Sequence, residues 1–297
     1  MDHAQQDGFA AFVEELWRHS LERVVKPHYS PKLLVQPYAQ LVGKTHKFLT
    51  EQFGKDEMEP LSWTRHAIKQ QLYMLHCVCD ISNEVVAASN TQYIHLGEDK
   101  AVVVIWQIAT AEEYRSRGVA WELILHACDQ ALERARQESR TIIALIGEVV
   151  EESEGFFNAL DMKRVYYTAR NGNVCEVPYL CPPVDMDSDT GQPLTATVPE
   201  HLMVRLFGSK IPTARELVRI VWSLYNTYLA GEEDYTSREA YITAREYMKS
   251  ILQELERTVM QAKTDDLLLL SAKQRVDTIW RLQETNNQLI AWETKEN

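Results

Sequence analysis

The stretch EYRSRGVAWELILHACDQAL, residues 113–132, sets two arginines and a glycine directly before an amphipathic run. Small and apolar side chains recur at helical spacing on one stripe, which consists of Ala120, Ile124, Ala127, Cys128, Ala131 and Ala135. The first amides of a helix lack backbone partners and carry about half a positive charge, so they form a ready site for an anion. Gly118 has no Cβ to hold an anion away, and Arg115 and Arg117 add donors and charge. The stretch predicts a helix that begins at an anion-binding turn; a solvated turn that only caps the helix is the alternative.

Strands are predicted on both sides of this helix. The segments before it that are rich in β-branched and aromatic residues are 72–81, 84–96 and 101–110. Short polar breaks separate them, so we expect three consecutive antiparallel strands. After the helix we expect a buried strand at 140–150, a short helix at 152–162 and a further strand at 163–169.

Helices are predicted at both ends of the chain. Apolar side chains at helical spacing indicate helices at 9–26, which ends before Pro27 and Pro31, and at 36–53. A polar loop begins at residue 181, and a last short apolar piece occupies 201–207. Beyond it every segment is predicted to be helical. The signals are the capping boxes TARE at 213–216 and TSRE at 236–239, and Gly231 as a helix end. The final stretch has an apolar side at helical spacing, formed by Val276, Ile279, Trp280, Leu282, Leu289, Ile290 and Trp292. We therefore divide the chain into a first domain, 1–208, and a C-terminal helical region, 209–297.

Charge and composition exclude several classes of protein. The net charge of −12 argues against binding to nucleic acid, which requires a basic surface. The five cysteines include no Cys-x-x-Cys pair, and Cys77 and Cys79 have the wrong spacing for a zinc knuckle, so we expect reduced thiols and no metal. Neither a signal peptide nor an apolar run of roughly 20 residues is present, which favours a cytoplasmic protein without a membrane partner.

The pattern Arg115-x-x-Gly118-x-Ala120, between a strand and an amphipathic helix, resembles the acyl-CoA pyrophosphate loop of the GCN5-related N-acetyltransferase (GNAT) superfamily. The run IATAEEYRSRGVA is similar to that family's passage from its fourth strand into the loop, and EGFFNALDMKRVYY resembles its late helix and following strand. The detailed resemblance covers residues 72–170. For residues 1–71 it rests on element order, and the C-terminal helices lie outside the family pattern.

The resemblance implies an α+β fold: a mixed, mostly antiparallel central sheet flanked by helices, with the C-terminal helical region added. It also implies acetyl-CoA as co-substrate, with the pantetheine pairing with a strand edge and the pyrophosphate held by the loop. The implied cofactor-binding residues are Ile108, Ala109 and Thr110 at the edge, Arg115, Ser116, Arg117, Gly118, Val119 and Ala120 in the loop, and Asn158 in the late helix.

The implied chemistry is direct attack of an amine on the thioester, which requires a base to remove a proton. Glu148, near the end of the strand at 140–150, is the candidate, and apolar neighbours there would raise the pKa of its carboxyl. The alternative is a glutamate that caps or salt-bridges the strand end. Glu112 and Glu113, at the mouth of the loop, are weaker candidates that we expect to be solvated.

Two departures from the family pattern concern the late helix. Phe157 stands where many members have a tyrosine that protonates the leaving thiolate, and Asp161 with Met162 replaces a Gly-Phe pair. Tyr166 and Tyr167 are substitutes for that acid or, alternatively, packed strand aromatics.

The preferred function is an acyl-CoA-dependent N-acyltransferase, an acetyltransferase acting on a small-molecule or peptide amine. The alternatives are an inactive binding or regulatory module of the same fold that retains CoA, and an all-helical interaction protein. Aromatic residues of the C-terminal helices, Trp222, Tyr225, Tyr228, Tyr241, Tyr247, Trp280 and Trp292, are expected in a core or an interface. They also suggest a homodimer through these helices, or a wall for the amine site.

Overall fold

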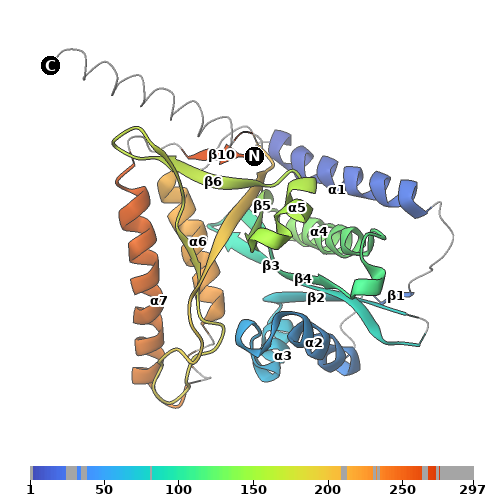
Figure 1. The fold of residues 1–297 in the computed structure, drawn as a ribbon, viewed down its shortest axis with the longest axis horizontal. Helices are drawn as coiled ribbons and strands as arrows, with labels where there is room; N and C mark the ends of the chain where they lie inside the picture. The colour runs from blue at the N-terminus through green and yellow to red at the C-terminus, as the bar shows by residue number, and fades with distance from the viewer. Residues whose placement is uncertain are drawn as a thin grey trace, which may run out of the picture.

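A mostly antiparallel sheet runs through the molecule and carries helices on both faces (Figure 1). The computed structural model describes residues 3–24, 32–34, 39–80, 82–208, 213–229, 232, 235–262, 267–271 and 274. Within these ranges the strands are β1 (Lys32–Leu34), β2 (Tyr73–Cys79), β3 (Val85–Leu96), β4 (Lys100–Thr110), β5 (Thr141–Val149), β6 (Lys163–Thr168), β7 (Val174–Glu176), β8 (Tyr179–Cys181), β9 (Val198–Leu206) and β10 (Leu268–Leu270). Their order is β1-β2-β3-β4-β5-β9-β6-β10, with β7 beside β6 and β8 beside β9. Of these pairings, only β4 with β5 is parallel.

The helices among the described residues fall into groups on the two faces. They are α1 (His3–Val24), α2 (Ala39–Phe53), α3 (Leu61–Lys69), α4 (Val119–Gln137), α5 (Glu154–Ala159), α6 (Ala214–Tyr228) and α7 (Arg238–Val259), with one-turn 3₁₀ segments η1 (Lys55–Glu57), η2 (Glu112–Tyr114) and η3 (Glu151–Ser153). Helices α1 and α4 share one apolar cluster with the sheet, and α6 and α7 share another (Figure 1). Helix α2 packs against β2 and β3 in a third cluster.

Side-chain alternation along the central strands explains the two clusters. In β4, Val102 and Val104 face α6 and α7, whereas Val103 and Ile105 face α1 and α4, and all four are buried. A strand covered on both faces is apolar at successive positions, as VVVI in β4 is. The alternation fixes the face of every site residue on these strands.

The central elements of the prediction are confirmed. The three consecutive antiparallel strands are β2, β3 and β4, and they are followed by α4, β5, α5 and β6 in the predicted order. The expected α+β fold with C-terminal helices is therefore observed. Helix α3, which follows Pro60, was not predicted, and β9 was predicted only as an apolar piece. Strand β9 inserts between β5 and β6, although it follows both in the chain.

The C-terminal region differs from the prediction in two places. Leu268–Leu270 is a strand that pairs with β6, so the prediction of helix throughout is wrong there, because the edge of β6 accepts another strand. The N-cap of α7 is Ser237 and not Thr236, whose hydroxyl is hydrogen-bonded to the Ser188 carbonyl instead. The box at Thr213 is confirmed.

Some predictions fall on residues outside the described ones, namely Pro27, Pro31, Gly231 and the stretch from Val276 to Trp292. The division at residue 208 stays a prediction. Of the predicted packing aromatics, Tyr225 is fully buried against the sheet, and Trp222, Tyr241 and Tyr247 are partly buried against the same cluster.

Candidate active site where two parallel strands part

Strands β4 and β5 part before they end. Their parallel pairing runs from Lys100↔Thr141 to Ile105↔Gly147, yet β4 continues beside β3 as far as Thr110. Strand β5 likewise continues beside β9. A register irregularity in the β3–β4 pair, at Trp106, coincides with the parting. The sheet is therefore open between the ends of its two parallel strands.

Backbone groups of β4 face this opening. Antiparallel pairs alternate between hydrogen-bonded and non-bonded positions, and the Ala111 amide donates to the Val86 carbonyl. It follows that Ala109 bonds to β3, whereas the backbone groups of Ile108 and Thr110 point toward β5. Of the three predicted edge residues, two present backbone groups to the opening and Ala109 does not.

The predicted anion turn lies at the carboxyl end of β4. Gly118 is the N-cap of α4 with φ of 85°, and no side chain caps this helix end. The first amide with a helical partner is that of Trp121, so the amides of Val119 and Ala120 precede the bonded part of the helix. Left-handed backbone at both Ser116 (φ 60°) and Gly118 bends the chain into the helix.

The two arginines of the turn lie differently. Arg115 donates from Nε to the Thr110 carbonyl at 3.1 Å, which ties the turn back to the strand. Arg117 is exposed, with its guanidinium 5.5 Å from the ring centre of Tyr114. The turn thus presents an exposed cation next to an uncapped helix end.

Glu148 is the first residue of β5 beyond the parting and is 8 % exposed. Tyr179 of β8 donates to Oε1 of Glu148, and the Cys181 thiol donates to Oε2 at 3.6 Å. Its side chain lies on the α6–α7 face with these partners, whereas α4 covers the opposite face. Glu148 is therefore a buried, hydrogen-bonded carboxylate, and its first identified partners come from a strand missing from the prediction.

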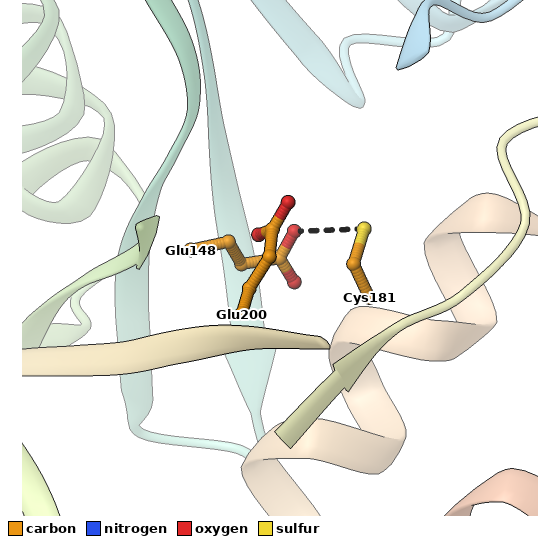
Figure 2. A group of neighbouring side chains, drawn as sticks. All are labelled: Glu148, Cys181 and Glu200. Atoms are coloured by element: carbon orange, nitrogen blue, oxygen red, sulfur yellow. Dashed lines mark hydrogen bonds between the residues drawn. The ribbon is translucent and has the colours of Figure 1, made fainter. Parts of the chain in front are cut away.

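Further acidic side chains gather near Glu148. One ligand atom each of Glu148, Cys181 and Glu200 lie within 4.8 Å of one another, close enough to surround a single cation (Figure 2). Desolvation, together with the charge of Glu57, raises the pKa of Glu200 to about 7. Burial likewise raises the pKa of Glu59, although its hydrogen bond from Tyr73 opposes the shift.

Polar side chains of β3 and β4 continue this group. Gln107 accepts a hydrogen bond from Asn90 at 3.2 Å and donates to the Glu57 carbonyl at 2.9 Å. Trp106 donates to the Gln92 side chain at 2.8 Å. Gln107 thus joins the end of β4 to the segment between α2 and α3.

Late-helix residues have mainly packing roles. Phe157 is 3 % exposed, and a Cβ added at Gly147 would lie 2.7 Å from its ring. Asn158 is half-buried on α5, where its carbonyl accepts from the Leu160 and Asp161 amides. The side chain at 157 therefore fills the core beneath β5.

The remaining candidates are exposed or packed side chains. Glu112 and Glu113 are exposed on η2. Tyr166 is buried on β6, and Tyr167 packs partly buried against the α6–α7 cluster. Both tyrosines occupy packing positions.

A second acidic cluster surrounds a buried cation. Arg164, 4 % exposed, forms ion pairs with Glu151 at 2.6 Å, with Glu154, and with Glu176 at 3.4 Å. His201 lies between two of these carboxylates, 2.7 Å from Glu176 and 2.8 Å from Glu151. This cluster links β6, β7 and β9 to the segment after β5.

The structure thus brings the turn and Glu148 to the same end of the sheet, because the carboxyl ends of the parallel strands β4 and β5 lie side by side. The Glu148 side chain lies on the α6–α7 face, whereas the turn leads into α4 on the other face, and β4 and β5 are unpaired between them. Residues missed from sequence are Tyr73, Tyr179, Cys181, Glu59 and Glu200. The signal that could have found them is weak: polar side chains inside otherwise apolar strands.

A model of the acetyltransferase (GNAT) family matches residues 43–159. Among solved structures, an acetyltransferase from Trypanosoma brucei has 16% identity over 44% of this chain and 89% of its own, with a TM-score of 0.34. Tetrahymena GCN5 has 12% identity over 58% of this chain and 90% of its own, with a TM-score of 0.33. The ribosomal-protein-S18-alanine N-acetyltransferase from Escherichia coli has 12% identity over 61% of this chain and 95% of its own, with a TM-score of 0.35. These likenesses are distant. No curated protein matches the chain. In the described part, no helix has the length and apolarity that a membrane crossing requires.

Proposed function

Since the chain belongs to the GNAT acetyltransferase superfamily through residues 43–159, we propose that it transfers an acyl group from acyl-CoA to an amine, with acetyl-CoA as the donor. The observation that carries this proposal is the parting of β4 and β5 next to an uncapped helix N-terminus. A thioester tail held on the α4 side could pass between the strands and present its carbonyl at Glu148. The residues proposed for the cofactor are those of the turn at 115–120, with Ile108 and Thr110 at the edge and Asn158 nearby.

Helix geometry supports pyrophosphate as the group held at the turn. The amides of Val119 and Ala120 would donate to its oxygens, and Arg117 would add charge. The Thr110 carbonyl already accepts from Arg115, so a pantetheine amide would pair with the remaining edge groups.

In the proposed reaction the amine nitrogen attacks the thioester carbonyl carbon, and a C–N bond forms as the C–S bond breaks. Glu148 accepts the proton that the nitrogen loses, and CoA leaves as a thiolate that is then protonated. The hydrogen bonds from Tyr179 and Cys181 fix the orientation of the carboxylate. Such a base contributes about 10²–10⁴-fold to the rate.

The second candidate is a binding or regulatory module that retains CoA without turnover. The buried Phe157, in place of a tyrosine acid, favours it. Because a thiolate leaves tolerably without an acid, the enzyme remains the preferred function.

Isothermal titration with acetyl-CoA, followed by a thiol-release assay over a panel of amines, tests the proposal. Binding together with release on at least one amine is the expected result. Binding without release on any amine would establish the module, and absence of binding would reject both.

A further inference from the structure

Strand β8 carries two hydrogen-bond donors to the Glu148 carboxylate. Tyr179 donates from its hydroxyl to Oε1 of Glu148, and the Cys181 thiol donates to Oε2 at 3.6 Å (Figure 2). Residues two apart in a strand point to the same face, so both donors reach the carboxylate from one side of β8. The strand is only three residues long and pairs with β9. Its position therefore sets both hydrogen bonds at once.

Helix α6 holds the middle residue of this strand. The hydroxyl of Tyr225 donates to the carbonyl oxygen of Leu180 at 2.6 Å, and Leu180 lies between the two donors in the chain. The residue opposite Leu180 on β9 is Pro199, which has no amide hydrogen to offer that carbonyl. Helix α6 thus supplies a donor that the neighbouring strand lacks.

The Tyr225 side chain makes this contact from inside the core. Its exposed fraction is 0 %, and the centre of its ring lies 6.1 Å from that of Tyr179, which is itself 2 % exposed. Removing the hydroxyl alone would leave the ring packing in place and take a donor from the Leu180 carbonyl. The first residue of β8 is therefore held through its ring and the second through its carbonyl.

The segment that follows β8 is attached to helix α7. The Thr236 amide, just before α7, donates to the Ser188 carbonyl at 3.0 Å. A Cβ added at Gly191 would lie 2.0 Å from the carbonyl oxygen of Ala240, so the two backbones are in direct contact there. Both C-terminal helices lie beyond residues 43–159, which the family model matches. Strand β8 and its continuation are thus anchored on the part of the chain that the family pattern lacks.

We propose that Tyr225 is a positioning residue for Glu148: by fixing β8 it sets the two hydrogen bonds that orient the carboxylate. The C-terminal helical region then contributes to the active site. This inference rests on the function proposed above and adds a residue to the same reaction. Tyr225 acts through the strand and takes no part in the proton transfer.

The test removes the hydroxyl and keeps the ring. In Tyr225→Phe we expect kcat for acetyl transfer to an amine to fall about tenfold, the effect of one lost buried hydrogen bond. The affinity for acetyl-CoA, measured by calorimetry, should stay nearly unchanged, because the turn at 115–120 is untouched. Tyr241→Phe is the matched control: it removes the hydroxyl of a partly buried tyrosine of α7 and should leave kcat at the wild-type value.

A double-mutant cycle separates positioning from a general structural role. In Glu148→Gln the base is already absent, so adding Tyr225→Phe should lower kcat no further. An equal fall in both backgrounds would overturn the inference, since the hydroxyl would then act on something other than Glu148. Wild-type kcat in the single variant Tyr225→Phe would also overturn it.

Hydrogen exchange followed by mass spectrometry separates failure of this inference from failure of the proposed function, because it needs no turnover. The peptide that contains Tyr179–Cys181 should exchange about tenfold faster in Tyr225→Phe, and at the wild-type rate in Tyr241→Phe. Faster exchange without turnover of any amine would uphold the anchoring of β8 and remove the enzyme. Unchanged exchange and unchanged kcat in an active protein would overturn the inference while the enzyme stands.

Discussion

Glu148 is the side chain on which the proposed chemistry depends most directly. Its carboxylate is held by Tyr179 and Cys181, so an isosteric amide would keep the shape and lose the base. We expect Glu148→Gln to lower kcat by about 100-fold or more at neutral pH, and by less at alkaline pH, where the free amine needs no base. Affinity for acetyl-CoA should stay nearly unchanged. A pH–rate profile equal to that of the wild type would exclude Glu148 as the base.

Glu200 gives a prediction for stability against pH. Its pKa is about 7 in the folded protein and 4.5 in the unfolded chain. Between pH 4.5 and pH 7 the folded protein therefore binds the proton more tightly than the unfolded chain does. Stability contributed by the neutral carboxyl is complete below pH 4.5 and decreases as the pH rises to 7, by at most about 3 kcal/mol. Urea unfolding at pH 5 and 7.5 should show a smaller decrease for Glu200→Gln than for the wild type. An identical decrease would mean that Glu200 titrates normally.

The start of α4 is the element on which cofactor binding is proposed to depend. Reversing the exposed charge nearest the uncapped amides should repel a pyrophosphate without disturbing the core. We expect Arg117→Glu to weaken acetyl-CoA binding by about tenfold or more by calorimetry, and Arg117→Glu with Gly118→Val to abolish it. Arg136→Glu, an exposed reversal in the last turn of the same helix, is the matched control. Equal affinity in the single variant and its control would remove the turn from the site.

Individual elements differ in how well sequence indicates them. The apolar repeat of α4 and the β-branched composition of β3 and β4 predicted those elements, because each buries a regular face. Strand β9 was missed at its start, where Pro199 and Glu200 interrupt the apolar pattern. Glu200 lies beside Glu148, and the next residue, His201, belongs to the Arg164 cluster, so polar positions that serve these groups obscure the strand pattern. Tyr179 meets Glu148 across 31 residues, a contact that only the sheet order creates.

At the scale of the whole molecule, the C-terminal helices and the sheet share one core. Leu224 of α6 is fully buried in the cluster that contains Ile146 of β5 and Val204 of β9. Leu224→Ala should destabilise the protein by about 2–5 kcal/mol, with circular dichroism and tryptophan fluorescence reporting one common transition. Separate transitions for the two signals would show that residues 209–297 unfold independently.

The opening in the sheet also constrains the kinetic order. If acetyl-CoA and the amine bind from opposite faces of the sheet, neither must dissociate before the other binds. A ternary complex of enzyme, acetyl-CoA and amine then precedes the transfer. Double-reciprocal plots should then intersect, and a thiol-less CoA analogue should compete with acetyl-CoA but not with the amine. Parallel lines would instead indicate an acyl-enzyme intermediate, from which CoA is released before the amine binds.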